Sequence, residues 1–509
     1  MANRSPIVHR LACCLFLLAA AEGATADVRH KIDPWVLERT RGGGETEFLL
    51  VLAEQADVSR AALISGKEAK GRYVFEKLRE TAARSQPAVT RLLEERRLPF
   101  RPYLVANMIW TSGKEEDALA LAALPGIARV AANPSVPLDR PVLLPAPEGA
   151  CPVAVSSGVA HTGAPALWAQ GIDGTGAVVA GADTGYDWDH PALQNAYRGW
   201  NGSAASHAYN WHDAIHTGGG VCGANSPQPC DDDDHGTHTM GTMLGDNGTQ
   251  VMGMAPGARW MACRNMDRGN GTPARYAECY QFFLAPTDAA GQNPDPDRAP
   301  DVINNSWGCP ASEGCTDPNV LRTVVENVRA AGIMVVSSAG NSGSGCSSVA
   351  TPSAIYDAAF TVGSTNNSDL ISGFSSRGAV TVDGSNRQKP DISGPGEDTC
   401  STLPGGDYGT KSGTSMASPH VAGLVALLID ARPCLRGEVD AIENYIKQTA
   451  VPRTTTQNCG GISGMSVPNN TYGWGAIRAV MPTPAVCPAL FADGFESGAT
   501  GAWSEVVAN

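Results

Sequence analysis

The stretch SMASPHVAGLVALLIDA (residues 415–431) carries one acidic side chain and is otherwise almost entirely apolar. Its length and composition predict a helix that is buried on all sides rather than on one stripe. A helix of this kind needs apolar partners all round, and short hydrophobic runs supply them between residues 155 and 480. The stretch therefore predicts the central helix of a layered domain.

Short apolar runs alternate with helical sequence throughout that region. Strands are predicted over GAVVAGAD (176–183), ARWMACRNM (258–266), APDVINNSWG (299–308) and IMVVSSAGN (333–341), and helices over HGTHTMGTML (235–244) and NVLRTVVENVRAAG (319–332). Buried strands between helices are typical of a parallel sheet covered on both faces. The predicted fold class for residues 155–482 is α/β, with a doubly wound, mostly parallel sheet.

A smaller unit with a different charge balance precedes this region. Residues 27–150 hold 18 Lys and Arg against 17 Asp and Glu, whereas residues 151–509 hold 17 against 33. Strands are predicted at 46–53, 100–110 and 127–134, with helical sequence at 67–97 and 115–126 between them. We therefore expect a small α+β domain over residues 27–140.

Two segments outside these domains are expected to be irregular. The proline-rich stretch PSVPLDRPVLLPAPEGACP (134–152) suits an exposed linker, because proline cannot hold helix or sheet ladders. We place a linker with a processing site at 141–154. Residues 483–509 form a C-terminal appendage to which the sequence assigns no role.

The first 26 residues have the pattern of an export signal. Arg4 and Arg10 make the start of the segment positive, LACCLFLLAAA (11–21) is a short apolar run, and ATA (24–26) is an A-x-A cleavage site. The run is about half of the roughly 20 residues needed to span a bilayer, so removal is expected rather than anchoring. The mature protein is then predicted to be secreted.

The cysteine content indicates the redox environment of the protein, and its charge indicates which classes of partner are excluded. Twelve of the 14 cysteines follow the signal, and an even number in an exported chain favours disulfides over metal thiolates. Short loops make Cys222–Cys230, Cys263–Cys279 and Cys309–Cys315 candidate bridges, while the full pairing stays open. The acidic body argues against nucleic acid or an anionic membrane as a partner.

Three short motifs carry the chemistry, and each falls where a predicted strand ends or a predicted helix begins. They are ADTG (182–185), HGTH (235–238) and GTSMASPH (413–420). Open α/β sheets place their reactive groups at such ends. A serine hydroxyl becomes a nucleophile when an imidazole takes its proton, and a carboxylate fixes and stabilises that imidazole. Ser415, His235 and Asp183 supply these three groups.

A developing oxyanion needs hydrogen-bond donors as well. Ser415 at a helix start presents its own N–H, aided by the helix dipole. Asn341 lies on the glycine-flanked turn SSAGNSG (337–343) and can offer its side-chain amide. Asn341 alone reads as a turn residue, but beside the three motifs it is expected to complete an oxyanion hole.

The order Asp, His, Ser with DTG, HGTH and GTSMASPH resembles the subtilisin family (subtilases) of serine endopeptidases over about residues 160–480. The resemblance implies a Ser-His-Asp triad, an acyl-enzyme intermediate and protein or peptide substrates. It also implies that Ser306, Trp307, Gly308 and Gly340 bind the substrate, with NNSWG (304–308) pairing to its backbone as an added strand. YNWHDAI (209–215) is similar to the bacillopeptidase F-like branch.

The same resemblance extends to the first unit. Residues 27–140 resemble the ferredoxin-like inhibitory propeptide of these enzymes, with LALAALPGIARV (119–130) as the best match. It implies a zymogen whose propeptide is an intramolecular inhibitor that occupies the cleft until it is cleaved. A small residue, Ala350, is expected near the floor of the main side-chain pocket, which would favour large apolar residues.

Some of these residues also allow other interpretations. The run Asp231–Asp234 is expected to be a solvated loop, with attraction of basic substrate side chains or a structural calcium ion as weaker alternatives. His238 is expected to pack in a helix; a zinc site with His235 would lack a third ligand and the Glu of H-E-x-x-H. The chemistry itself requires no metal or other cofactor. A catalytically dead binding module is the alternative from another functional class.

Overall fold

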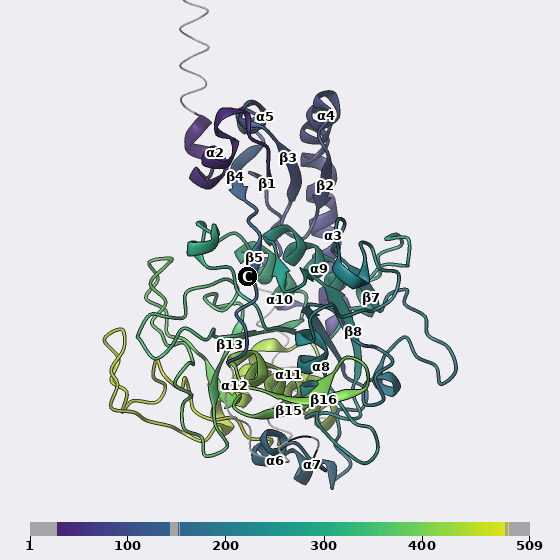
Figure 1. Cartoon of the computed structure of the whole chain (residues 1–509), viewed down its shortest axis with the longest axis vertical. Coiled ribbons are helices and arrows are strands. Elements are labelled where there is room, and N and C mark those ends of the chain that lie inside the picture. The colour runs from purple at the N-terminus through teal and green to yellow at the C-terminus, as the bar shows by residue number, and fades with distance from the viewer. Residues whose placement is uncertain (1–27, 143–150, 152, 484–486, 488–509) are drawn as a thin grey trace, which may run out of the picture.

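The computed structural model describes residues 28–142, 151, 153–483 and 487 (Figure 1). The predicted signal peptide, most of the linker with its processing site and most of the C-terminal appendage lie outside the described residues. The described part has two units. A small unit lies at the top of Figure 1, and a larger one lies below it.

The larger unit is built on a seven-stranded sheet in the order β14-β13-β12-β11-β6-β8-β7. All neighbouring strands in it are parallel. The strands are β6 (Val178–Asp183), β7 (Trp211–Asp213), β8 (Arg259–Arg264), β11 (Val302–Asn305), β12 (Met334–Ser338), β13 (Phe360–Thr365) and β14 (Ile392–Pro395). The predicted α/β fold with a parallel sheet is confirmed.

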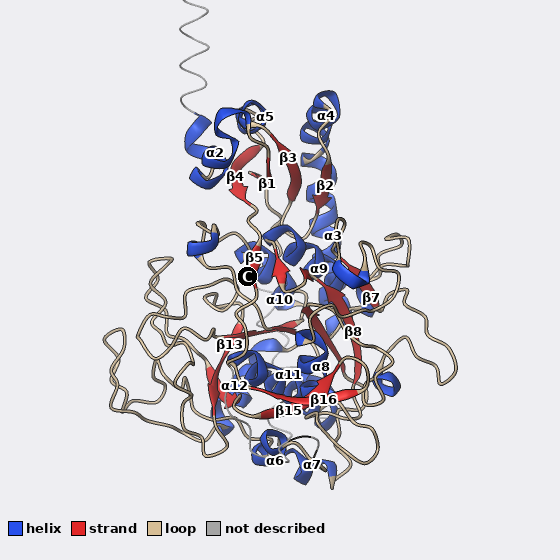
Figure 2. Ribbon diagram, in the orientation of Figure 1, coloured by secondary structure: helices blue, strands red, loops and turns tan. Residues whose placement is uncertain are grey.

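Helices cover both faces of this sheet (Figure 2). Val179, Val302 and Val336 point into one apolar core with helices α8 (His235–Leu244) and α11 (Thr414–Ala431). Their neighbours in the strands point into a second core on the opposite face, with α9 (Pro273–Leu284) and α10 (Arg322–Ala330). This alternation follows from the two-residue period of a strand. Helices α6 (Ser157–Thr162), α7 (Ala164–Trp168) and α12 (Val439–Thr449) complete the unit.

The apolar stretch 415–431 forms most of α11, the central helix. Among the described residues, α11 is the helix long and apolar enough to cross a membrane, yet 94% of that window is buried inside the protein. It contacts α8 and lies over β11 to β14. Its apolar surface is thus satisfied by the core.

The smaller unit contains an antiparallel sheet in the order β2-β3-β1-β4. The chain order strand-helix-strand-strand-helix-strand is the ferredoxin-like arrangement. Its elements are α2 (Pro34–Thr40), β1 (Thr46–Leu52), α3 (Lys67–Ser85), α4 (Pro87–Arg96), β2 (Phe100–Tyr103), β3 (Met108–Gly113), α5 (Glu115–Ala122) and β4 (Ile127–Ala132).

Two elements predicted as continuous in this unit are each divided in two. The expected strand 100–110 is a hairpin, β2 and β3, whose turn includes Asn107 in a left-handed conformation (φ 40°). Asn tolerates this conformation. The turn was not predicted, because the residues around Asn107 are mostly apolar and indicated a continuous strand. The expected helix 67–97 is divided at Pro87, which lacks an N–H and begins a new helix.

The two units share a hydrophobic core and a set of ion pairs. Leu49, Val74 and Tyr103 of the small unit pack in the same core as Tyr276 and Phe283 of α9. In each ion pair that joins the described parts of the two units, the cation belongs to the N-terminal segment. The pairs are Lys67–Asp301, Lys70–Glu438, Arg72–Asp297, Arg101–Glu278, Arg129–Asp317 and Arg140–Asp233.

The segment after the small unit is not the exposed linker that its prolines predicted. Strand β5 (Val136–Pro137) pairs antiparallel with β10 (Asn270–Gly271). The side chains of Val136 and Leu138 are buried. Proline is tolerated here because only two residues pair, at the edge of a small sheet. The other short strands are β9 (Met266–Asp267), β15 (Thr399–Leu403) and β16 (Asp407–Lys411).

Disulfides connect distant parts of the larger unit. The three short-loop bridges predicted from the sequence, Cys222–Cys230, Cys263–Cys279 and Cys309–Cys315, are all formed. Three long-range bridges accompany them: Cys151–Cys400, Cys346–Cys459 and Cys434–Cys487.

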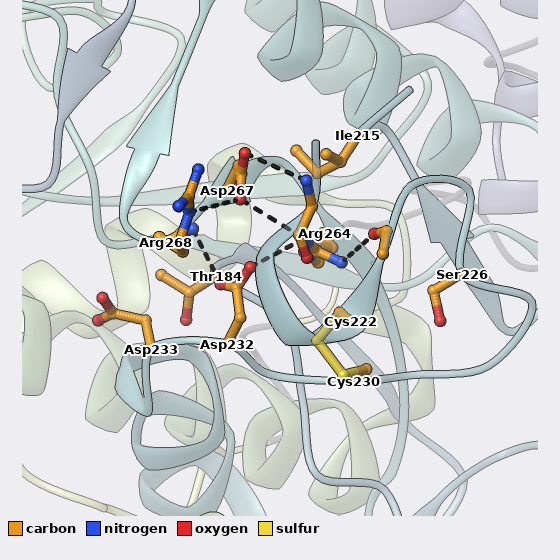
Figure 3. A network of polar contacts seen from close by, with 12 residues as sticks. Thr184, Ile215, Cys222, Ser226, Cys230, Asp232, Asp233, Arg264, Asp267 and Arg268 are labelled. Carbon is orange, nitrogen blue, oxygen red and sulfur yellow. Dashed lines mark hydrogen bonds and ion pairs between the residues drawn. A yellow bond between two sulfur atoms is a disulfide. The ribbon is translucent and has the colours of Figure 1, made fainter. Parts of the chain in front are cut away.

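A buried arginine organises the loop that leads to α8 (Figure 3). Arg264, at the end of β8, is fully buried. Its Nη2 lies 2.9 Å from Asp232 Oδ2 and donates to Gly219 O at 2.9 Å. Its Nη1 lies 3.5 Å from Asp213 Oδ2. These contacts hold the loop closed by Cys222–Cys230 against the sheet.

Replacing Arg264 with Met should destabilise the protein strongly. The change leaves buried carboxylates without their cation, which costs about 3 kcal/mol or more of unfolding free energy. Thermal or denaturant unfolding of the full chain measures this. Arg268→Met is the matched control, because Arg268 is largely exposed, and it should change the unfolding free energy by less than about 0.5 kcal/mol. Equal stability of the two variants would contradict the role given to Arg264.

Candidate active site

The three predicted catalytic residues lie at the ends of elements that meet at one edge of the parallel sheet. Asp183 is the last residue of β6, His235 the first residue of α8, and Ser415 the second residue of α11. Helices α8 and α11 pack against each other, and Ser415 contacts Ser306, which follows β11 at the same edge of the sheet. Asp183, His235 and Ser415 are buried, with at most 2% of each exposed.

Asp183 and His235 form a direct hydrogen bond. His235 Nδ1 lies 2.7 Å from Asp183 Oδ1, and the backbone N–H of Thr184 donates to the same oxygen at 2.8 Å. Because a carboxylate only accepts, the contact assigns the imidazole proton to Nδ1. His235 Nε2 is then an acceptor, and it has no hydrogen-bond partner among the described residues. The arrangement leaves one basic nitrogen available.

Ser415 does not hydrogen-bond to His235 in this structure. Its Oγ donates to the carbonyl of Ser306 at 3.3 Å, and Ser306 Oγ donates back to the carbonyl of Ser415 at 3.1 Å. The expectation that all three groups lie in one hydrogen-bonded chain is therefore met for Asp183 and His235 alone. Catalytic hydrogen bonds commonly tighten only when substrate binds.

Asn341 is fixed in one orientation beside the start of α11. Its Oδ1 accepts from the Thr414 N–H at 2.8 Å and from the Thr414 hydroxyl at 3.0 Å. An N–H donor must face oxygen, so this contact identifies which end of the amide is which. Asn341 Nδ2 is buried and has no partner among the described residues. Gly340 precedes it at φ 97°, in the left-handed region. The amide thus presents an unused donor.

The acidic run before His235 is not a solvated loop, and that interpretation was wrong. Asp231 Oδ2 accepts from the N–H and hydroxyl of Thr237 at 2.9 and 2.6 Å, and Oδ1 accepts from Thr184 Oγ1 at 2.8 Å. Oδ1 also accepts from the backbone N–H of Asp233 and of Asp234. Asp231 therefore fixes the first turn of α8. The run of acidic residues just before a predicted helix start was the available signal for such a role.

The other three carboxylates of the run have cationic partners. Asp232 pairs with Arg264, Asp233 with Arg140, and Asp234 with Lys411. These partners lie far away in the sequence, so the run by itself could not indicate them. Within the described chain, no group of His, Cys, Asp and Glu is placed to hold a metal ion.

His238 and His420 both lie in helix interiors. His238 Nε2 lies 3.1 Å from Thr399 O, and His420 Nδ1 lies 2.8 Å from Met416 O. Burial lowers the pKa of His238 well below its usual value, and burial lowers the pKa of His420 to about 4. Both rings therefore act as neutral packing and hydrogen-bonding groups.

The predicted substrate-binding residues line a cavity next to Ser415. Ser306, Gly308 and Gly340 line a hollow of about 310 Å³ that also includes Glu313 and Thr351. Trp307 borders the same hollow. Its ring stacks on Tyr276 with centroids 3.8 Å apart, and its Nε1 donates to Ala182 O at 3.0 Å. The expected preference for large apolar residues stays a prediction, since Glu313 and several serines also line this cavity.

Residues 136–142, here called the tail, cross the site. Strand β5 pairs with β10, and Leu138 N donates to Gly269 O at 2.7 Å. Asp139 Oδ2 accepts from Asn341 N at 2.8 Å, and Val142 N donates to Ser412 O at 2.7 Å. The sequence did not identify β10 as the strand partner; the glycines on either side of Asn270 were the one available signal.

Comparisons with known proteins agree with this geometry. Residues 174–475 match the subtilase family. Bacillopeptidase F of Bacillus subtilis (strain 168) is 34% identical over 496 residues, 91% of this chain and 33% of that protein. Subtilisin E of the same strain is 34% identical over 282 residues, 55% of this chain and 62% of that protein. Subtilisin Savinase of Lederbergia lenta is 30% identical over 328 residues, 64% of this chain and 97% of that protein.

The chain thus spans about a third of the length of bacillopeptidase F and under two thirds of subtilisin E. The family match covers most of the larger unit, including the ends of β6, α8 and α11 where the three motifs lie. The protein belongs to the subtilase family.

Proposed function

We propose that this protein is a serine endopeptidase that hydrolyses peptide bonds through an acyl-enzyme intermediate. The observation that carries the proposal is the buried hydrogen bond from His235 Nδ1 to Asp183, which leaves Nε2 free to accept a proton. Ser415 lies at the start of the helix that packs against α8. The names of the relatives, bacillopeptidase F and the subtilisins, agree with this activity.

In the proposed reaction Ser415 Oγ attacks the carbonyl carbon of the peptide bond while His235 Nε2 takes the hydroxyl proton. Asp183 holds the imidazole and stabilises its positive charge. The oxyanion accepts hydrogen bonds from Ser415 N–H and Asn341 Nδ2. His235 then gives its proton to the leaving amine, and a water molecule repeats the sequence to release the acyl group and restore the hydroxyl.

The proposal requires no cofactor for the chemistry, because the base, the nucleophile and the donors all come from the chain. A structural calcium ion stays a prediction of the sequence. The proposed partners are protein or peptide substrates, and the acidic body of the chain argues against nucleic acid and anionic membranes.

We further propose that residues 27–140 are an inhibitory propeptide and that the enzyme is secreted as a zymogen. Two observations support the inhibitory role: the tail crosses the site, and cations of the N-terminal unit pair with the acidic peptidase unit. Six disulfides and the leader sequence support export.

Ser415→Ala should abolish peptide hydrolysis without unfolding the protein. Removing the nucleophile of such a triad lowers the turnover rate by about a millionfold. Hydrolysis of a fluorogenic peptide, with thermal unfolding as a check on folding, measures both effects. The exposed residue Ser368 gives the matched control, and Ser368→Ala should keep full activity. Comparable hydrolysis by both variants would rule out Ser415 as the nucleophile.

High salt and loss of Lys67 should both accelerate release of the N-terminal unit. Lys67 Nζ is buried and donates to Asp301 Oδ1 at 2.8 Å and Ala299 O at 2.6 Å. Lys67→Met removes one of the cations that pair with Asp301. It should weaken the association of the N-terminal unit with the peptidase unit by at least about tenfold. Raising salt from about 0.01 M to about 1 M shortens the Debye length and should weaken the exposed pairs.

The appearance of peptidase activity over time measures this release. Lys77→Met serves as the control, because Lys77 pairs with Glu80 inside its own unit. If Lys67→Met activated at the same rate as the unchanged protein, the proposed role of Lys67 would be contradicted. If the activation rate did not change with salt concentration, an inhibitor held by ion pairs would be contradicted.

A further inference from the structure

The tail brings one cationic side chain to the carboxylates beside His235. Arg140 Nη1 donates to Asp233 Oδ1 at 2.6 Å. The Asp233 side chain is only 7% exposed beneath it, whereas the Arg140 side chain is 58% exposed. Given the proposed peptidase function, we propose that Asp233 selects substrates with Arg or Lys at the position that Arg140 occupies in the tail.

Asp233 is the one carboxylate of the acidic run that depends on the tail for its counter-ion. Asp231 is saturated by hydrogen bonds from its own loop and helix, and Asp232 and Asp234 pair with Arg264 and Lys411 of the peptidase unit. Within the described residues, Arg140 is the only side chain paired with Asp233. When the tail leaves, this carboxylate loses its partner, so a substrate cation in the same place would restore a favourable pair.

The space around the guanidinium is kept open by a glycine. Gly269 has φ 74°, and a Cβ there would lie 2.7 Å from Arg140 Nη2 and 3.2 Å from Asp233 Oδ2. Gly269 O also accepts from Leu138 N of the tail. One residue therefore pairs with the tail backbone and leaves room for a long basic side chain two positions further along. The same backbone pairing by a substrate would carry its side chain to Asp233.

The tail marks the route that a substrate backbone would follow. It pairs with β10 on one side of the site, passes Asn341 at Asp139, and pairs with Ser412 on the other side. In the tail, Arg140 directly follows Asp139, which contacts Asn341, and it precedes Val142, which pairs with Ser412. Selection by Asp233 thus concerns a substrate residue near the bond that is cleaved, at the border of the cavity that Arg140 lines together with Gly308 and Thr351.

Cleavage profiling of the self-processed enzyme on a peptide library tests this selection. We expect Arg and Lys to be enriched at one fixed position beside the cleaved bond. Matched fluorogenic peptides with Arg or Gln at that position should then differ about tenfold in kcat/KM. In Asp233→Asn the two peptides should be hydrolysed at similar rates, with the Gln peptide little affected. Asp233→Lys should instead favour Glu at this position.

Asp357→Asn is the matched control, because Asp357 is exposed, pairs with Arg387 and is not among the residues that line the cavity. It removes the same charge and should keep the preference for Arg. Hydrolysis without enrichment of Arg or Lys at any one position, or an Arg preference that survives in Asp233→Asn, would overturn the role of Asp233. Failure to hydrolyse any peptide would instead contradict the proposed peptidase function on which this inference rests.

Discussion

The hydrogen bond between His235 and Asp183 is the contact on which the other features of the site depend. Both side chains are almost fully buried, so the bond lies where water does not compete and electrostatic interactions are strong. It joins the last residue of β6 to the first residue of α8. Asp231 secures the first turn of α8, and Arg264 secures the loop before it. The polar contacts of Asp183, Asp231 and Arg264 together position the imidazole of His235.

The acidic character of the larger unit has a structural counterpart in the smaller one. The ion pairs that join them take their cations from the N-terminal segment and their carboxylates from the peptidase unit. Such an arrangement favours one orientation of the two units and makes their association sensitive to salt. The shared apolar core around Tyr103 supplies the rest of the contact. The proposed release of the N-terminal unit would therefore depend on salt concentration.

Sequence reasoning succeeded where the signal was local. The apolar runs identified β6, β8, β11 and β12, and the helix predicted from His235 to Leu244 begins and ends at those residues. The motifs correctly predicted that Asp183 and His235 lie at the same edge of the sheet, because the carboxyl ends of parallel strands all lie at one edge. It failed where partners are distant. Asp233 meets Arg140 across 93 residues, and the acidic run therefore looked solvated. The proline-rich tail looked unpaired because its partner, β10, is only two residues long.

The central claim is that Ser415 is a nucleophile activated by His235. Labelling with a serine-directed phosphonate, followed by peptide mapping, tests it most directly. We expect one label per active chain, on Ser415, and no label when His235 is replaced by Ala in a chain that still folds. A label on another residue, or equal labelling of Ser415 without the imidazole, would contradict the account.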